Sequence, residues 1–406
     1  MKIEAKSAGA LTGGENGTLY GSVEMGSTGW LLTSRLGGQD RVQRRRVASN
    51  DWRATISTLR RQQKACGAQR VVCCYEAGRE GFWPYRALQA AGIETYVLDP
   101  ASIAVNQRGR RTKTDRIDGV QEVDAVEALE LGLRTAARAV VVPSEEQEEA
   151  RQLSRTRSRL VKERTALITY IKSGLARVGV DLPPATQPGW REQLAKARQW
   201  DGERPLPRQL VRDIELSHER LMLVCRQIGD LEDEQRIAVI SCQSSGKRRL
   251  IKTRQAAQAW DAQASPAQRR LADQAERLSR LVSIAPVTGY VLAGEVYWRD
   301  FRNRRQVGGY VGLGGAQRSS GKQQRELGIS KAGNRRARHV LVEVAWTWVE
   351  HQPDSPITQW FRRRAPKGAS PRQRRVAIVA VARKLAVALW YYLNDGVVPQ
   401  GARMKD

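Results

Sequence analysis

Residues 71–78 read VVCCYEAG, a β-branched and apolar run that leads into an acid and a glycine. A run of this kind predicts a short, buried strand. Similar runs lie at Thr18–Glu24, Trp30–Ser34 and Ile93–Leu98. The chain therefore begins with a set of strands that can share one sheet.

Helical patterning lies between and after these strands. Alternating strands and helices predict an α/β domain with a central sheet. We expect this domain to span residues 18–140, after a flexible N-terminus at 1–17 that is rich in glycine and polar residues. The expected helices lie near 51–65, 82–91 and 115–131.

A different pattern follows the α/β domain. Leu153, Leu160 and Leu167 are spaced seven residues apart, and apolar residues from 210 to 231 recur mostly at spacings of four and three. This pattern predicts two long helices that form a coiled-coil arm at residues 141–265, with an irregular, proline-rich linker at 181–207. The two helices can pack within one chain or against a second copy, and we favour contact with a second copy.

The rest of the chain is predicted to be mainly α-helical. A C-terminal domain is expected at residues 266–398, followed by a tail at 399–406. Residues 307–326 are rich in glycine and serine and are expected to form a loop. The apolar run 376–392 is interrupted by Arg383 and Lys384, which favours a buried helix over a membrane span.

The charge of the chain points to a polyanionic partner. Lysine and arginine number 69 against 42 acids, a formal net charge of +27. Such an excess costs self-repulsion in the folded state unless a polyanion neutralises it, and nucleic acid does so with release of counterions. A solvated basic surface is the simpler alternative.

The cysteines and histidines argue against two other kinds of site. The five cysteines are odd in number and lack Cys-x-x-Cys spacing, which disfavours a disulfide framework and a zinc site and fits a reduced, cytoplasmic setting. The three histidines are not spaced four apart. Carboxylates must therefore carry any metal chemistry.

Four acids are candidates for a metal site. Glu24 ends the first strand, Glu76 follows the strand at 71–74, and Asp115 and Asp118 lie three apart at a helix start, on one helix face. Strand-end acids and such a pair can converge on Mg²⁺, which prefers oxygen ligands. Two such ions stabilise the attacking and leaving oxygens of a phosphodiester.

Three of the four acids also have a simpler interpretation. Asp115 suits the first turn of a helix because of the helix dipole, and Asp118 can pair with Arg116. Glu76 can pair with Arg79. The combination of two strand-end acids with a helical pair, in so basic a chain, favours the metal site.

Basic residues accompany both candidate sites and are predicted to bind nucleic acid, although a solvated surface remains the alternative. The loop 108–113 reads RGRRTK, and the stretch 312–322 reads GLGGAQRSSGK. Ser319 and Ser320 in the second stretch need activation to act as nucleophiles. The neighbouring cations Arg318 and Lys322 can stabilise the charge on an attacked phosphate. From chemistry alone, a passive role for the serines is favoured. The basic candidates are Arg108, Arg110, Arg111, Lys113, Arg318, Lys322, Lys331, Arg335 and Arg336.

Several motifs, in order, resemble the DEDD transposases of the IS110 insertion-sequence family, relatives of the Piv-type DNA invertases. They are YEAG at 75–78, YRALQAAG at 85–92, KTDRID at 113–118, and a C-terminal series that ends in ISKAGN at 329–334. The resemblance covers about residues 18–132 and 280–395. It implies an N-terminal RuvC-like (RNase H-like) domain, a coiled-coil arm and a C-terminal transposase domain with a serine loop.

The resemblance also implies a mechanism. Glu24, Glu76, Asp115 and Asp118 would bind Mg²⁺, and Ser320, with Ser319 as the alternative, would attack DNA to form a covalent phosphoserine. A structured guide (bridge) RNA would pair with donor and target DNA. Carboxylates of one subunit would act with the serine of another, in a homo-oligomer such as a dimer or tetramer, with no membrane partner.

One residue departs from the family pattern. The first acid of the family is usually aspartate, and Glu24 stands there in this chain. Mg²⁺ requires near-ideal geometry, so the extra methylene can shift or weaken the site. A weakened site at Glu24 leaves open a catalytically silent nucleic-acid-binding protein. The other alternative is a RuvC-like metal-dependent nuclease that uses water and forms no covalent intermediate.

Overall fold

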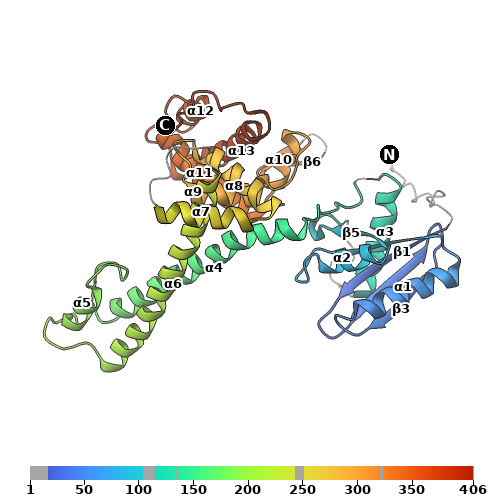
Figure 1. Cartoon of the computed structure of the whole chain (residues 1–406), viewed down its shortest axis with the longest axis horizontal. Helices are drawn as coiled ribbons and strands as arrows, with labels where there is room; N and C mark the ends of the chain where they lie inside the picture. Colours follow the sequence, from blue (N-terminus) through green and yellow to red (C-terminus); the bar gives the residue numbers. More distant parts are fainter. Residues whose placement is uncertain (1–16, 104–114, 134, 243–250, 321–322, 406) are drawn as a thin grey trace. The chain divides into compact units, whose positions relative to one another are not determined.

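The computed structural model describes residues 17–103, 115–133, 135–242, 251–320 and 323–405, without the side chains of 115–116, 251–254 and 316–327. The chain forms two compact units, Met1–Val142 and Pro143–Asp406 (Figure 1). The first is an α/β unit and the second is mainly helical. The predicted N-terminus at 1–17 falls, except for Gly17, outside the described residues.

A mixed five-stranded sheet forms the centre of the first unit, in the order β3-β2-β1-β4-β5. β1 pairs antiparallel with β2, which pairs antiparallel with β3, whereas β4 and β5 run parallel to β1. The four strands predicted from sequence are present. The bounds are β1 Thr18–Met25, β2 Trp30–Leu36, β3 Val42–Val47, β4 Arg70–Glu76 and β5 Glu94–Leu98.

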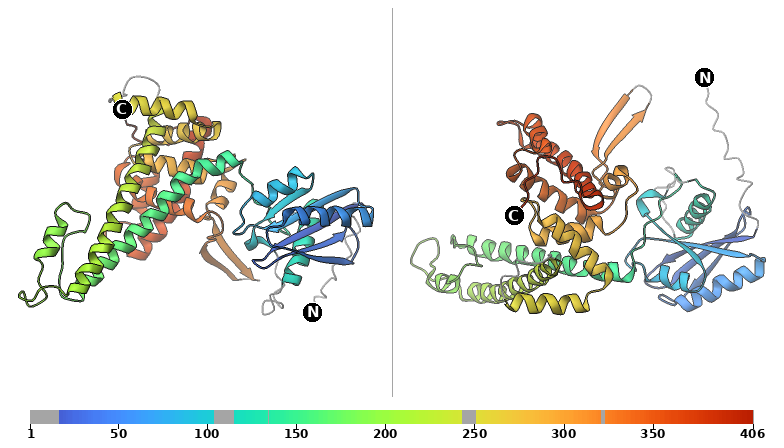
Figure 2. Two further views of the ribbon diagram at one scale, coloured as in Figure 1. Left: turned by 60° about the horizontal axis from the view of Figure 1, so that its bottom comes forward. Right: turned by 45° about the horizontal axis from the view of Figure 1, so that its top comes forward.

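Helices cover both faces of this sheet (Figure 2). α1 (Trp52–Cys66) and α2 (Trp83–Ala90) pack on one face, where Leu59 and Leu88 join the core with Val23. α3 (Asp115–Glu130) packs on the other, where Val123 and Val126 meet Tyr20 and Val72. The 3₁₀ turn η1 (Pro100–Ser102) follows β5. The predicted α/β architecture is confirmed.

The edge strand β3 was not predicted from the sequence. Its residues VQRRRV lack an apolar alternation, and Arg44, Arg45 and Arg46 are exposed. Charged side chains on an edge strand discourage pairing with another sheet. The strand exists because β2 offers it a hydrogen-bonding edge, and composition alone does not reveal this.

Two long helices begin the second unit. α4 (Glu145–Ala176) and α6 (Arg208–Ser241) run antiparallel, because Arg157 of α4 donates to Glu232 at 2.8 Å and Arg220 of α6 pairs with Glu163 at 3.2 Å. The predicted leucine spacing lies on their shared face: Leu160 packs with Val224 and Ile228, and Leu167 with Ile171, Ile214 and Leu221.

This packing corrects one expectation. We favoured a second copy as the partner of the leucine-spaced face, and the structure buries that face within one chain instead, since Leu221 is 0% and Val224 4% exposed. The prediction was wrong because spacing alone does not distinguish a neighbouring helix from a second molecule. Coiled-coil geometry itself stays a prediction.

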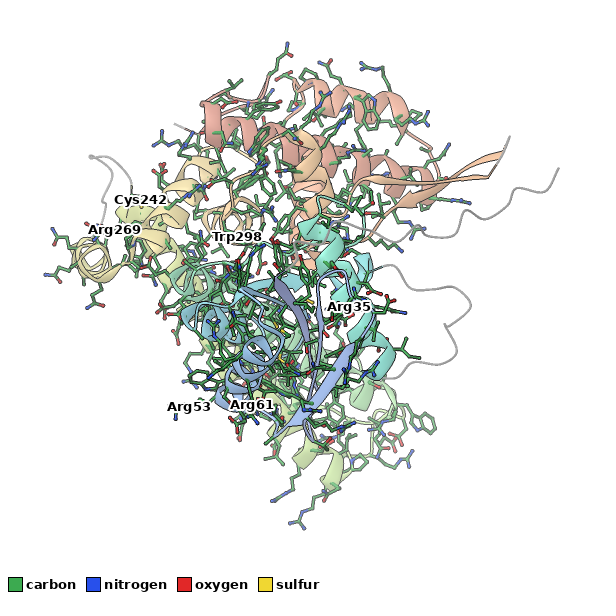
Figure 3. All side chains as sticks on the ribbon, turned by 90° about the vertical axis from the view of Figure 1, so that its right-hand side faces the viewer. Arg35, Arg53, Arg61, Cys242, Arg269 and Trp298 are labelled. Carbon is green, nitrogen blue, oxygen red and sulfur yellow. The ribbon has the colours of Figure 1, made fainter. Side chains whose placement is uncertain are left out.

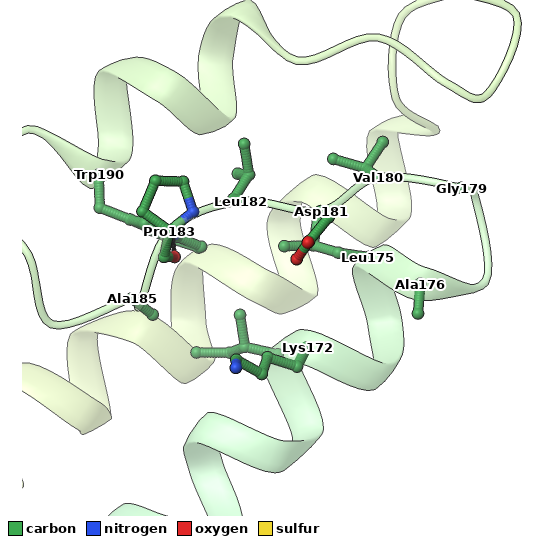
Figure 4. A pocket seen from close by; sticks show the side chains of 11 residues that line it. Lys172, Leu175, Ala176, Gly179, Val180, Asp181, Leu182, Pro183, Ala185 and Trp190 are labelled. Carbon is green, nitrogen blue, oxygen red and sulfur yellow. Dashed lines mark hydrogen bonds between the residues drawn. The ribbon is translucent and has the colours of Figure 1, made fainter.

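The proline-rich linker is more ordered than expected. It contains α5 (Trp190–Lys196), and the Trp190 indole donates to the Pro183 carbonyl at 3.1 Å and stacks on His218 of α6. Burial of Trp190 and Leu194 holds the segment against the arm. A pocket of about 330 Å³ at this end of the arm is mostly apolar, and no predicted site residue lines it (Figure 4); its lining includes Lys172, Leu175, Asp181 and Trp190.

The remaining helices surround a core centred on α13 (Pro371–Asp395). By length and composition alone α13 could cross a membrane, but half of its most apolar stretch is buried. Val381 and Leu385 pack there with Leu341 and Trp348, which confirms the predicted buried helix. The other elements are α7 Ile251–Gln263, α8 Pro266–Ser279, α9 Pro286–Leu292, the π-helical turn η3 Ala293–Tyr297, α10 Arg304–Tyr310, α11 Arg335–His351 and α12 Pro356–Arg364.

Residues 307–326 do not form the expected loop. They contain the end of α10 and an antiparallel hairpin of β6 (Gly315–Ser320) and β7 (Gln323–Ile329), which extends from the helices of the unit (Figure 2). The expectation relied on glycine and serine content, and cross-strand hydrogen bonds overcome that local preference.

We expect Leu221→Ala to destabilise the arm by about 2–5 kcal/mol, because it opens a cavity between α4 and α6. Leu216→Ala is the matched control on the same helix, since Leu216 is 54% exposed and should cost less than about 0.5 kcal/mol. Urea unfolding followed by circular dichroism measures both. Equal destabilisation by the two substitutions would contradict the packing described.

Candidate active site

The acids of β1 and β4 share the sheet face that α3 covers. Side chains alternate along a strand, and Tyr20 of β1 and Cys74 of β4 lie in the core beneath α3. Glu24 and Glu76, at even spacing from these residues, belong to the same face. Ser22 is paired with Cys74 across the two parallel strands, and the two acids each lie two residues further along. They are therefore neighbours across adjacent strands.

A glycine lets α3 approach this face closely. A Cβ atom on Gly119 would lie 2.5 Å from the Thr33 hydroxyl, so no other residue fits without displacement. The Ser22 hydroxyl donates to the Gly119 carbonyl at 2.9 Å, which joins α3 to β1. The first turns of α3 are thus held against the strands that carry Glu24 and Glu76.

Arg35 of β2 fastens the next part of α3. Its guanidinium pairs with Asp124 at 2.7 Å and with Glu127, and lies beside the helix (Figure 3). Burial opposes the charge of Arg35, but these two carboxylates raise its pKa. The ion pairs fix the rotation of α3 about its axis, because both acids must face β2.

The buried acid Glu122 of α3 was missed by the sequence reasoning. It is 1% exposed, and its pKa is raised to about 9 by burial and then by the charges of Glu24, Glu76 and Asp118. Each of these three acids therefore acts on Glu122 through its charge. Glu122 follows Asp118 by four residues, on the same helix face, and that spacing could have revealed it.

The predicted metal ligands are only partly described. Asp118 is half-buried on α3, and Asp115 begins the helix, but the Asp115 side chain lies outside the described part. Within that part, no three acids, cysteines or histidines are grouped tightly enough to hold an ion. Arg79, which the sequence suggested as a partner of Glu76, forms an ion pair with Glu80 at 3.0 Å.

The chemistry of these acids nevertheless suits a divalent cation. All donors are carboxylate oxygens, which hard cations prefer. Both Glu122 oxygens are buried with no hydrogen-bond partner among the described residues, and such groups in native proteins call for an explanation such as an ion. The residues present therefore fit a metal site.

The candidate serines lie at the end of the β6–β7 hairpin. Ser320 is paired with Gln323 and Ser319 with Gln324. The Ser319 and Ser320 side chains are outside the described atoms, as are the Arg318 side chain, Lys322 and the loop residues Arg108, Arg110, Arg111 and Lys113. After the hairpin, the Ser330 backbone N–H donates to the Gly314 carbonyl at 2.8 Å.

A buried polar cluster anchors the segment that follows the hairpin. The Asn334 side-chain amide donates to the Glu295 carboxylate and to the Tyr310 hydroxyl, each at 3.0 Å, and its oxygen caps the first turn of α11. Glu295, 1% exposed, also accepts from Arg155 of α4 at 3.0 Å. One side chain thus joins α10, α11 and η3.

Backbone contacts hold both ends of the hairpin as well. Gly312 and Gly333 have positive φ of 64° and 99°, and a Cβ would lie 2.0 Å from the Ala332 carbonyl oxygen or 2.3 Å from that of Tyr310. Lys331, between these contacts, is exposed with φ of 55°, which is uncommon outside glycine. Arg335 and Arg336 are exposed beside it.

Comparison with known proteins finds transposases. A sequence profile of IS110-type DEDD transposases matches residues 38–179, and one described as the IS116/IS110/IS902 transposase family matches 275–359. A Sinorhizobium fredii protein named "Putative transposase y4rJ" is 36% identical over 96% of this chain and 95% of its own length. The transposase for insertion sequence element IS1111A of Coxiella burnetii is 26% identical over 87% and 83%, respectively.

These matches bear on the fold of the first unit and on the assignment of Glu24. The DEDD profile implies a RuvC-like fold and a divalent-metal site for the first unit, and the mixed sheet covered by helices agrees with that fold. The match begins at residue 38, after Glu24. Glu76, Asp115 and Asp118 lie within it, and Glu24 does not.

We expect Glu122→Gln to stabilise the metal-free protein at alkaline pH. The folded pKa of about 9 exceeds the ordinary 4.5, so stability falls as pH rises through this window. Gln removes the ionisation, which gives roughly 2–4 kcal/mol near pH 8 and almost nothing near pH 5. Thermal unfolding in a chelator measures the difference, and an equal effect at both pH values would contradict the cause.

We expect Asn334→Ala to cost about 2–4 kcal/mol, because it removes a helix cap and leaves the buried Glu295 carboxylate short of a donor. Asn303→Ala is the control: Asn303 caps α10 through Arg305 and Gln306 but meets no buried carboxylate, so about 1 kcal/mol is expected. Urea unfolding compares them. Equal losses would show that Asn334 acts only as a cap.

Proposed function

Because this chain belongs to the IS110 family of DEDD transposases, we propose that it cuts and rejoins DNA through a covalent link between Ser320 and a DNA phosphate. The observation that carries the proposal is that Glu24 and Glu76 are neighbours on one sheet face and that α3, which carries Asp118 and Glu122, packs on that face. Concentrated carboxylates in a chain of net charge +27 suit phosphodiester chemistry.

The carboxylates serve to hold the metal. Glu24, Glu76, Asp115 and Asp118 would hold Mg²⁺, a hard cation that proteins bind through carboxylates and substrate phosphates. When bound, Mg²⁺ supplies charge stabilisation to the attacking and leaving oxygens of the phosphodiester. The close contact of Gly119 with Thr33 supports this role, because it holds the helical acids against the strand acids.

The serine supplies the nucleophile. Its Oγ forms a bond to phosphorus, one P–O bond of the DNA breaks, the serine loses its proton, and the leaving deoxyribose oxygen gains one. In rejoining, a DNA hydroxyl attacks the phosphoserine and restores the serine. Arg318 and Lys322, next to Ser320 in sequence, stabilise the negative charge on the attacked phosphate.

A structured guide RNA selects the DNA. It pairs with donor and target strands, so the protein contacts backbone and shape rather than base edges. The exposed Lys331, Arg335 and Arg336, and the arginines of 108–111 with Lys113, bind these phosphates. The protein acts as a homo-oligomer, dimer or tetramer, in the bacterial cytoplasm at the nucleoid.

The parts of the chain divide this work. Residues 18–140 form the RuvC-like domain, the helical arm at 141–265 packs as a coiled coil, and residues 266–398 form the transposase domain with the serine. Carboxylates of one subunit meet the serine of another. The anchored ends of the β6–β7 hairpin support this assignment, because a nucleophile must be presented from a fixed base.

We expect Ser320→Ala to abolish a protein–DNA adduct that survives denaturation, while nucleic-acid binding stays within about twofold. The hydroxyl that forms the bond is lost, and no charge changes. Purified protein with co-purified RNA, labelled DNA and Mg²⁺ is assayed by denaturing gel, with Ser319→Ala as the matched control.

The results of this assay distinguish the alternatives. An adduct that persists in Ser320→Ala and vanishes in Ser319→Ala would move the nucleophile to Ser319. Cleavage without any adduct would indicate a water-dependent nuclease, and tight binding with no cleavage would indicate a silent binding protein.

A further inference from the structure

The helix α3 carries one more buried acid than the four implied by the family resemblance. Glu122 is 1% exposed, and both of its carboxylate oxygens lack a hydrogen-bond partner among the described residues. An unpaired polar group in this position costs roughly 1–3 kcal/mol or more. An apolar side chain would fill the same space at no such cost.

Among the described residues, the polar groups nearest Glu122 do not neutralise its charge. The Ser22 hydroxyl lies close and favours the charged form, but its proton is donated to the Gly119 carbonyl. The Cys74 thiol donates to the Glu122 backbone carbonyl at 3.4 Å and not to the carboxylate. Two cations that meet this helix are engaged by other acids, Arg35 by Asp124 and Glu127, and Arg70 by Glu94 and Glu130.

The other neighbours of Glu122 are acids. α3 packs on the sheet face to which Glu24 and Glu76 belong, and Asp118 lies one helical turn before Glu122 on the same helix. Ionised carboxylates on one face repel one another, and a counter-charge relieves this repulsion. The counter-charge that fits a cluster of oxygen donors, partly closed to water, is a divalent cation.

We propose that Glu122 is an additional ligand of the divalent cation at this site and faces the ion from α3, one helical turn after Asp118. This inference rests on the proposed metal site and extends it by one residue. It explains why an acid stands at a buried position of α3, and why its two oxygens have no hydrogen-bond partner in the described part of the chain. Glu122 thereby supplements Glu24, whose side chain is longer than the aspartate usual in the family.

The test uses the full-length protein and Mn²⁺ alone, without nucleic acid. Free Mn²⁺ is counted by electron paramagnetic resonance, and the cation-dependent rise in melting temperature is measured in parallel. Glu122→Gln should weaken binding about 10–100-fold, as loss of a metal-facing group does. Gln has the shape of the protonated acid, so the fold is expected to persist, and circular dichroism checks this.

Asp40→Asn is the matched control. It also removes one carboxylate from the first unit, but Asp40 is exposed between β2 and β3 and has no part in holding α3. Mn²⁺ affinity should change less than about twofold, because solvent screens an exposed charge. Glu122→Asp keeps the carboxylate on a shorter arm and should bind between the wild type and Glu122→Gln.

The failures are distinguishable. Binding by Glu122→Gln within about twofold of the wild type would overturn the inference and leave the metal site intact. Equal weakening in Glu122→Gln and Asp40→Asn would also overturn it, since net charge alone would then explain the loss. A wild type that binds no Mn²⁺ would overturn both the inference and the proposed metal site.

Discussion

The close packing of α3 on the sheet is the constraint on which the candidate site depends. Gly119 has room for a hydrogen atom only, against Thr33 of β2, and this brings the helix backbone near the strands. The Ser22 hydrogen bond and the Arg35 ion pairs then fix the helix along and around its axis. A larger residue at position 119 would lift α3 and separate its acids from those of β1 and β4.

This arrangement concentrates negative charge where the fold gains nothing from it. Burial and three neighbouring acids raise the pKa of Glu122 to about 9, so the metal-free protein keeps that carboxyl protonated near neutral pH. Acids whose pKa values are perturbed in this way cluster at functional sites. The same repulsion that destabilises the metal-free protein makes the face attractive to a cation.

In the second unit, a buried polar network lies beside the two ends of the β6–β7 hairpin. Glu295, Tyr310 and Asn334 form a buried network between η3, α10 and α11, and Arg155 of α4 completes it. Networks of this kind specify one arrangement when every member is satisfied. These residues precede or follow the hairpin in sequence. They fix the position of its two ends, while Ser320 lies at its far end.

The sequence by itself determined much of this protein. Strand and helix periods predicted the α/β unit, the leucine spacing predicted the face between α4 and α6, and the ordered motifs identified the family, because local patterns and motif order are written along the chain.

Tertiary structure decided the rest. β3 needed an edge on β2, α5 needed a surface for Trp190, the glycine-rich stretch became a hairpin through cross-strand bonds, and the leucine face closed within one chain. Glu122 belongs with these: its spacing from Asp118 was visible, but only burial beside three acids of separate elements gives it a role, and burial is a property of the folded chain.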